Sequence, residues 1–129
     1  MIDNDRAAVI QIGDTNYTLV LTTKATKEIA KRYGGLEKLG DKLMKSENFE
    51  LALDEVVWLI TLLANQGILI HNLQNSDKQA ILTEEMVELL TSPFDLADYK
   101  NAIMDAMYKG TKRNVEGEDE ASSKNAKVG

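Results

Sequence analysis

The long apolar stretch from about Glu47 to Leu73 constrains the fold more than any other feature of the sequence. Apolar residues recur along it at spacings of three and four, which is the repeat of an α-helix. Trp58, Leu59 and Leu62 widen the apolar surface beyond a single stripe, so other elements must surround this helix. Its most apolar part, residues 56–70, is interrupted by polar side chains and is shorter than the roughly 20 apolar residues that span a bilayer. We therefore predict a buried helix at the centre of the domain.

A β-hairpin is predicted before this helix. In the segments AVIQI and YTLVL, side chains alternate with their neighbours in the two-residue repeat of a β-strand. Gly13, Asp14 and Asn16 lie between the two segments and are typical turn residues. A two-stranded hairpin alone is marginal in water, so it must lie against helices or pair with the edge of another chain. An open strand edge would favour self-association.

Two short helices are predicted between the hairpin and the central helix. The first begins after an N-cap at Thr22 or Thr23 and runs to Tyr33, with Ala25 and Ile29 on its apolar stripe. Gly34 and Gly35 end it, and a helix C-cap explains this glycine pair better than a phosphate-binding loop, because the pair follows a helix. The second helix spans about Leu36 to Lys45 and presents leucines on one face.

Two more helices are predicted after the central one, beyond a polar loop. Thr83 caps a short helix, and Ser92-Pro93 starts a last helix that runs to about Lys109 and stops at Gly110. Five of its residues are predicted to face the core: Phe94, Ala97, Ile103, Met104 and Met107.

These elements predict an α+β fold that is mainly helical, with an N-terminal hairpin packed on a bundle of about four to five helices. The predicted domain covers residues 1–110. Residues 111–129 hold few large apolar side chains and many charged ones, so we predict a flexible polar tail there.

The composition gives no sign of an enzyme. The chain has no cysteine, which excludes a disulfide framework and a thiolate nucleophile, and its acidic N-terminus does not resemble a signal peptide, so a cytoplasmic location is expected. His71 is the single histidine and is interpreted as a solvated or hydrogen-bonded residue at a helix end. The pairs Asp54-Glu55 and Glu84-Glu85 are interpreted as solvated helix faces. We predict no catalytic residue, no metal and no cofactor.

Charge is distributed unevenly along the chain, whose net charge is −6. Residues 24–45 carry seven bases and three acids, net +4, whereas residues 46–108 carry eleven acids and two bases, net −9. The basic segment is interpreted as a solvated face or a protein contact; nucleic-acid binding is disfavoured by the acidic pI of about 4.8. We expect opposite patches on neighbouring copies to attract each other, the candidate contact residues being Lys24, Lys27, Lys31, Arg32 and Lys42 against Glu47, Glu50 and Asp54.

The order of these elements resembles the tail assembly chaperones of long-tailed bacteriophages and prophages. The resemblance covers most of residues 8 to 110, and its opening motif is carried by seven positions: Gly13, Tyr17, Leu19, Thr22, Ala25, Ile29 and Gly34. The resemblance implies a non-enzymatic protein of the host bacterial cytoplasm that is not retained in the mature virion. It implies many copies that coat the tape-measure protein and keep it soluble while the tail tube assembles.

Two further expectations follow from the resemblance. The tail tube protein is a second candidate partner, and a programmed frameshift near the codons for Lys124 or Lys127 would append a second domain in a longer form. Homo-oligomers or an open spiral are expected, because contacts that do not close on themselves generate spirals. The alternative function is a small structural tail or connector protein of the virion.

Overall fold

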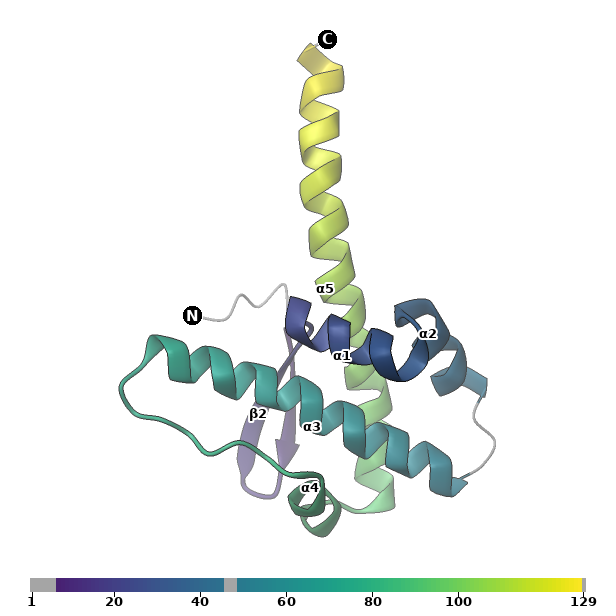
Figure 1. The fold of residues 1–129 in the computed structure, drawn as a ribbon, viewed down its shortest axis with the longest axis vertical. Coiled ribbons are helices and arrows are strands. Elements are labelled where there is room, and N and C mark those ends of the chain that lie inside the picture. Colours follow the sequence, from purple (N-terminus) through teal and green to yellow (C-terminus); the bar gives the residue numbers. More distant parts are fainter. Residues whose placement is uncertain (1–6, 46–48, 129) are drawn as a thin grey trace.

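The computed structural model describes residues 7–45 and 49–128, with side chains described for residues 7–42 and 53–111. The elements follow the order β1 (Ala7–Ile12), β2 (Thr15–Val20), α1 (Thr23–Tyr33), α2 (Leu36–Lys45), α3 (Phe49–Gln74), α4 (Glu84–Leu90) and α5 (Pro93–Val128). Figure 1 shows α3 across the middle of the domain, with α1 and α2 on one side of it and α4 on the other side. The predicted α+β, mainly helical fold with an N-terminal hairpin is confirmed.

A two-residue turn joins the two antiparallel strands of the hairpin. Gly13 adopts a φ of 61°, a value that glycine reaches without steric cost, between the paired residues Ile12 and Thr15. One face carries Ala8 and Ile10, which are buried and paired with Leu19 and Tyr17. That face is the contribution of the hairpin to the core.

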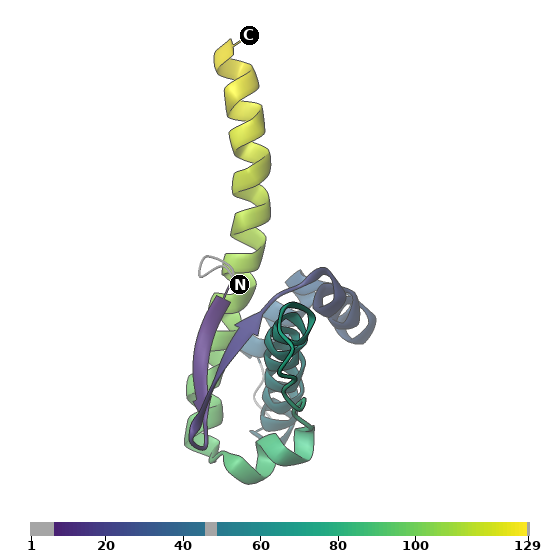
Figure 2. The ribbon, with the colours of Figure 1, turned by 90° about the vertical axis from the view of Figure 1, so that its left-hand side faces the viewer.

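Both edges of the hairpin are covered by helices. The Tyr99 hydroxyl and the Lys109 ammonium of α5 donate hydrogen bonds to the backbone carbonyls of Gln11 (2.5 Å) and Ala7 (3.1 Å) on the outer edge of β1. Figure 2 shows α5 along the β1 side of the hairpin and α3 along the β2 side. The expectation of an open strand edge for self-association is therefore wrong for the strands described, because helices already occupy those edges.

Gly67 allows α3 to lie directly against β2. A Cβ atom at this position would come within 2.5 Å of the Thr18 carbonyl oxygen, which is closer than real Cβ atoms approach a backbone oxygen. Thr18 pairs with Val9, so its carbonyl points away from β1, as those of Ala7 and Gln11 point away from β2. Glycine is needed here for close approach of two backbones.

The predicted caps of α1 are confirmed. Thr22 is the N-cap, and its hydroxyl oxygen accepts a hydrogen bond from the Ala25 N–H at 3.0 Å. Gly34 ends the helix with a φ of 92°, and Ala25 and Ile29 are fully buried between the caps. The Thr22 hydroxyl also donates to Gln66 Oε1 at 2.5 Å, which ties the start of α1 to α3.

The central helix is surrounded, as predicted. Val56, Leu59, Ile60 and Leu63 are buried, and α3 contacts both the hairpin and α5. By length and composition alone the stretch Leu53–Gln74 could cross a membrane, but half of its most apolar window is buried inside the domain, as in the core helix of a folded protein.

The last helix differs from its prediction in two ways. Phe94, 86% exposed, and Ala97, also exposed, do not face the core, because the buried face of α5 is formed by Leu96, Tyr99 and Ile103. The prediction that Gly110 stops the helix is also wrong, since α5 continues to Val128.

Gly110 has a packing role in place of the predicted stop. A Cβ atom there would lie 2.9 Å from Leu21 Cβ, so glycine lets the β2–α1 connection pack against α5. Beyond Thr111 the helix projects away from the other elements, as Figures 1 and 2 show. A C-terminal tail outside the packed domain was predicted; that this tail is flexible stays a prediction.

Candidate functional site

The first polar cluster that the fold assembles is centred on Glu55. This carboxylate is only 8% exposed, and it pairs with Arg32 Nε at 3.4 Å and Lys42 Nζ at 3.3 Å. The Tyr33 hydroxyl donates a third contact to it. The interpretation of Asp54-Glu55 as a solvated pair is therefore right for exposed Asp54 and wrong for Glu55, because a buried carboxylate is retained where cations and a hydroxyl compensate its desolvation.

Aromatic rings hold the two cations of this cluster in place. The Arg32 guanidinium carbon lies 4.4 Å from the centroid of the Trp58 ring, and Lys42 Nζ lies 5.4 Å from the Tyr33 centroid. The Tyr33 and Trp58 rings meet edge to face at a centroid distance of 5.9 Å. The cluster thus joins α1, α2 and α3, and two of the predicted contact residues, Arg32 and Lys42, have partners inside the chain.

Sequence reasoning missed this cluster, although a signal was present. Glu55 lies three and seven residues before Trp58 and Leu62, so it shares their side of α3. A carboxylate on the apolar side of a central helix has to be buried and paired.

The remaining basic contact residues lie on α1 and are exposed. Lys31 Nζ is 3.7 Å from Glu28 on the same helix, with side chains 72% and 41% exposed, a pair that contributes little stability. Within the described part of the chain, Lys24 and Lys27 form no ion pair, so they are the most available positive charges on α1.

The acidic contact residues are described only in part. Glu47 lies outside the described residues, and Glu50 belongs to α3 but its side chain is outside the described part. Asp54 is exposed. The structure therefore places one acid of the predicted triplet on the surface.

A groove runs between α1, α3 and the segment that leads to α4. Its volume is about 360 Å³, and Trp58, Leu62, Leu69 and Ile81 supply its apolar lining. Three charged residues also line it: Lys24, Glu28 and Glu84. We call this feature the α3 groove. It has the mixed apolar and polar lining of a site for a peptide or helix.

One wall of the α3 groove is fixed by two asparagines of α3. The Asn65 amide donates to the Leu82 carbonyl at 2.9 Å and accepts from the Leu82 N–H at 2.7 Å. Asn72 forms the same pair of bonds with Gln79, at 3.0 and 2.8 Å. Because the asparagines lie seven residues apart on α3, they hold residues 79–82 alongside the helix. Ile81, 52% exposed, is thereby kept beside the groove.

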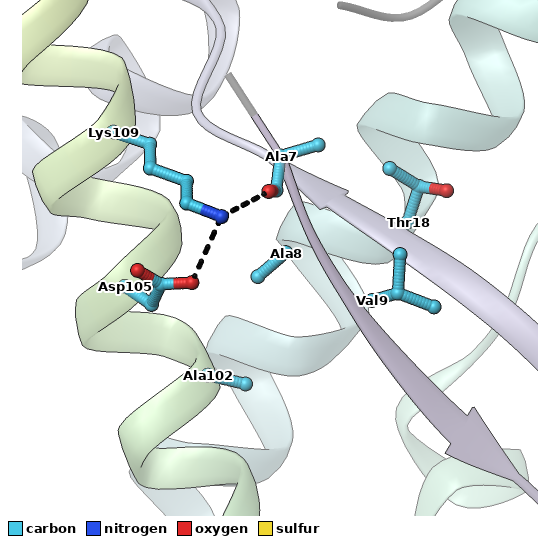
Figure 3. Close-up of a pocket in the computed structure, with 7 residues that line it drawn as sticks. All are labelled: Ala7, Ala8, Val9, Thr18, Ala102, Asp105 and Lys109. Atoms are coloured by element: carbon cyan, nitrogen blue, oxygen red, sulfur yellow. Dashed lines mark hydrogen bonds and ion pairs between the residues drawn. The ribbon is translucent and has the colours of Figure 1, made fainter. Parts of the chain in front are cut away.

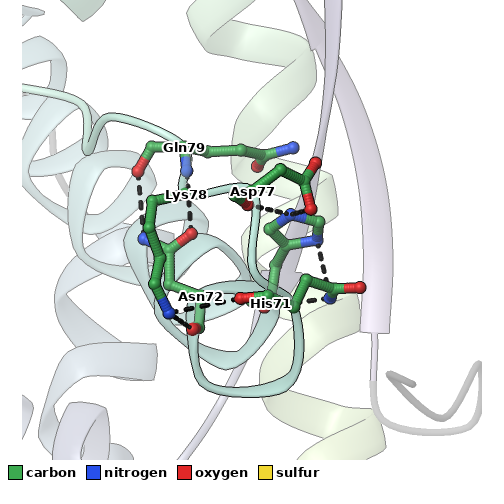
Figure 4. Close-up of polar contacts among 6 residues, drawn as sticks. His71, Asn72, Asp77, Lys78 and Gln79 are labelled. Carbon is green, nitrogen blue, oxygen red and sulfur yellow. Dashed lines mark hydrogen bonds and ion pairs between the residues drawn. The ribbon is translucent and has the colours of Figure 1, made fainter.

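His71 lies in the last turn of α3 and contacts the loop that follows the helix. Its Nε2 lies 3.0 Å from the Asp77 carbonyl oxygen and its Nδ1 lies 3.2 Å from the Asn75 amide. Lys78, in that loop, donates to the backbone carbonyls of Asn72 in α3 and of Asn75, and Figure 4 shows these polar contacts. The interpretation of His71 as a hydrogen-bonded residue at a helix end is confirmed, and its contacts are structural.

A second cavity, of about 420 Å³, lies between β1 and α5 (Figure 3). Small side chains such as Ala7 and Ala102 line it, together with Asp105 and Lys109. These two charges are 3.3 Å apart, and Lys109 also donates to the Ala7 carbonyl. Its charged groups therefore bind each other and the edge of β1.

Among the described residues, no group of three or more histidine, aspartate or glutamate side chains is placed to hold a metal ion. The one histidine has loop partners, and Glu55 is neutralised by two cations.

Comparisons of the chain with protein-family models, with curated proteins and with solved structures found no match. The resemblance to tail assembly chaperones stays a prediction that rests on the residues quoted above.

Proposed function

We propose that this protein is a tail assembly chaperone, which oligomerises in the host cytoplasm and binds the tape-measure protein to keep it soluble. The observation that carries the proposal is the distribution of exposed apolar side chains. Nine large hydrophobic residues of the described part are strongly exposed, and seven of them fall between Leu69 and Phe94. Concentrated apolar exposure of this kind is typical of a protein-binding surface.

The α3 groove is the proposed site for the tape-measure protein. Leu69 and Ile81 are exposed beside it, and the asparagine bonds to residues 79–82 keep that wall in place before a partner arrives. A preformed apolar groove can take the apolar face of a helix without the cost of ordering its own wall. Such coverage would shield long helical segments of a tape-measure protein from aggregation.

Oligomerisation is proposed to use the exposed lysines of α1. Lys24, Lys27 and Lys31 lie on the surface, whereas Arg32 and Lys42 bind Glu55 and the described strand edges are covered by helices. An exposed acidic patch on a second copy, which would include Asp54, is the proposed counterpart. Contacts between exposed charges are screened over about 8 Å at physiological ionic strength, so the oligomers should weaken as salt rises.

Co-expression with a tape-measure protein of a long-tailed bacteriophage tests the proposal. Wild type should keep that protein soluble, and Leu69→Ser with Ile81→Ser should lose this effect because both residues line the α3 groove. Val9→Ser is the matched control, since Val9 is 65% exposed on the hairpin away from the groove. A tape-measure protein that stays insoluble with wild type would contradict the proposal.

The alternative, a structural tail or connector protein, makes a different prediction. A chaperone leaves the assembly, so the chain should be missing from purified particles. Detection of the chain in stoichiometric amounts in particles, by mass spectrometry, would replace the chaperone proposal with the structural one.

A further inference from the structure

The short helix α4 leaves an apolar stripe partly exposed in the described structure. Met86, Leu89 and Leu90 are 38%, 76% and 50% exposed, and their spacing places them on one side of the helix. Val87, fully buried, points to the core and so fixes which side of α4 is outward. Phe94, 86% exposed, follows four residues after Leu90 at the start of α5. We call Met86, Leu89, Leu90 and Phe94 the α4 corner.

The turn between the two helices is held by specific hydrogen bonds. The Thr91 hydroxyl donates to the Val87 carbonyl at 2.6 Å. Ser92 and Asp95 form a reciprocal cap, with the Ser92 N–H donating to Asp95 Oδ2 at 2.8 Å and the Asp95 N–H donating to Ser92 Oγ at 3.3 Å. The α4 corner is therefore a preorganised surface, which lowers the entropy that binding would cost.

The surroundings of the α4 corner carry charge of one sign. Residues 79–99 contain five acids and no base, a net charge of −5. Glu84, Glu85, Glu88 and Asp98 are exposed, and within the described part of the chain none of them forms an ion pair. Asp54 and Glu88 also line a hollow of about 200 Å³ beside the start of α5. A partner that covers the apolar stripe must bring positive charge with it.

We infer that the α4 corner binds a basic amphipathic helix of a partner protein. Apolar residues of that helix would cover the α4 corner, and its flanking lysines or arginines would face Glu85 and Asp98, which are exposed four residues from Leu89 and Phe94 on the same helices. The α4 corner supplies four of the exposed apolar residues that support the proposed function, but none of the four lines the α3 groove. Variants at Leu89 and Phe94 therefore test this inference, and variants at Leu69 and Ile81 test the proposed function.

Two segments of a second copy, α1 and residues 112–129, fit the α4 corner less well. The α1 helix offers exposed lysines, but none of the large exposed hydrophobic residues of the described part lies on it. Residues 112–129 contain only Val115 and Val128 as large apolar residues. Neither segment combines the apolar and basic residues that the α4 corner requires.

A labelled synthetic helix of leucine and lysine at amphipathic spacing, about 15 residues long, tests the inference with the full chain. Fluorescence anisotropy should show binding that weakens with salt, and the same peptide with glutamate in place of lysine should not bind. Leu89→Ser with Phe94→Ser should weaken binding by about tenfold or more, as loss of central apolar contacts does. Val9→Ser should bind as wild type, because Val9 is exposed on the hairpin.

Neutralisation of the acids separates charge from apolar contact. Glu85→Gln with Asp98→Asn should weaken binding and flatten its salt dependence while the apolar stripe remains. Equal binding of the glutamate peptide, or unchanged binding by the Leu89→Ser, Phe94→Ser variant, would overturn the inference. Loss of self-association in that variant by sedimentation velocity, with no peptide binding by wild type, would assign the surface to a second copy and overturn it as well.

Discussion

The α1–α2 side of the molecule and the α4 corner differ in how their charges and apolar groups are used. On the first side, Arg32 and Lys42 bind buried Glu55, and helices cover the edges of the neighbouring hairpin. At the α4 corner the acids are exposed beside uncovered leucines and Phe94. A count of charges along a sequence therefore does not show which surface is free. Burial and pairing decide which charges hold the fold and which remain for a partner.

The largest expected effect is on the paired side. Glu55→Ala should lower the free energy of unfolding by about 3 kcal/mol, at the low end for a broken buried ion pair because Arg32 and Lys42 can regain water. Urea denaturation followed by circular dichroism measures it. Asp54→Ala, at the adjacent exposed position, is the control and should change stability by less than about 0.5 kcal/mol. Equal effects of the two substitutions would remove the contrast between the two regions.

The next effect tests the contact between α3 and β2. Gly67→Ala should lower the free energy of unfolding by about 2 kcal/mol, because the strain of the added Cβ against the Thr18 carbonyl exceeds the gain in helix propensity. Gly40→Ala is the matched control, since a Cβ in α2 at that position meets nothing within 4 Å and should stabilise the chain by up to about 1 kcal/mol. A stabilising Gly67→Ala would mean that α3 and β2 are farther apart than described.

A smaller effect is expected at the other edge of the hairpin. Burial, with the negative charges of Asp95 and Asp98 next, raises the pKa of the Tyr99 hydroxyl above its ordinary value of 10.0. Tyr99→Phe should lower the free energy of unfolding by about 1 kcal/mol, because the hydrogen bond to the Gln11 carbonyl is missing.

The pH dependence of Tyr99 follows from the direction of that pKa shift. Because the folded pKa is raised, its contribution to stability is complete below pH 10.0 and is lost as pH rises through the folded pKa. The free energy of unfolding of wild type and of Tyr99→Phe should be measured from pH 8 upward. The difference in favour of wild type should shrink above about pH 10. A difference that grows with pH would contradict the assigned contact.

The smallest effect on stability is expected at the α4 corner. Leu89→Ser with Phe94→Ser should change the free energy of unfolding by less than about 0.5 kcal/mol, because both side chains are more than three-quarters exposed. Urea midpoints of this variant and of wild type give the comparison. A loss similar to that of Glu55→Ala would show that the α4 corner is part of the core and not a free surface.

The sequence predicted best those features that local chemistry determines. The Thr22 cap, the Gly34 end of α1 and the proline start of α5 are settled by neighbouring residues, and all three lie where expected. The bounds of α2 also agree with the prediction. At such positions, hydrogen bonds between residues that are close in the sequence determine where the helix begins or ends.

Features that depend on distant contacts were predicted less well. Phe94 is a large apolar residue of the kind usually found in a core. The register of α5 instead buries Leu96 and Tyr99, and the Tyr99 hydroxyl bonds to the hairpin. Gly110 was expected to end a helix and serves instead as a contact for Leu21, which is 89 positions away in sequence (110 minus 21). Among the contact residues, the sequence could not show that Arg32 is paired within the chain while Lys27 is exposed. No local pattern carries that information.

Amide hydrogen exchange of the full chain, with and without the leucine–lysine helix, tests most directly whether the α4 corner is the free surface of this molecule. Added protection should be confined to α4 and the first turns of α5, with none on α1 or α2. Protection that appears on α1 and α2 and leaves α4 unchanged would contradict the division between the two regions.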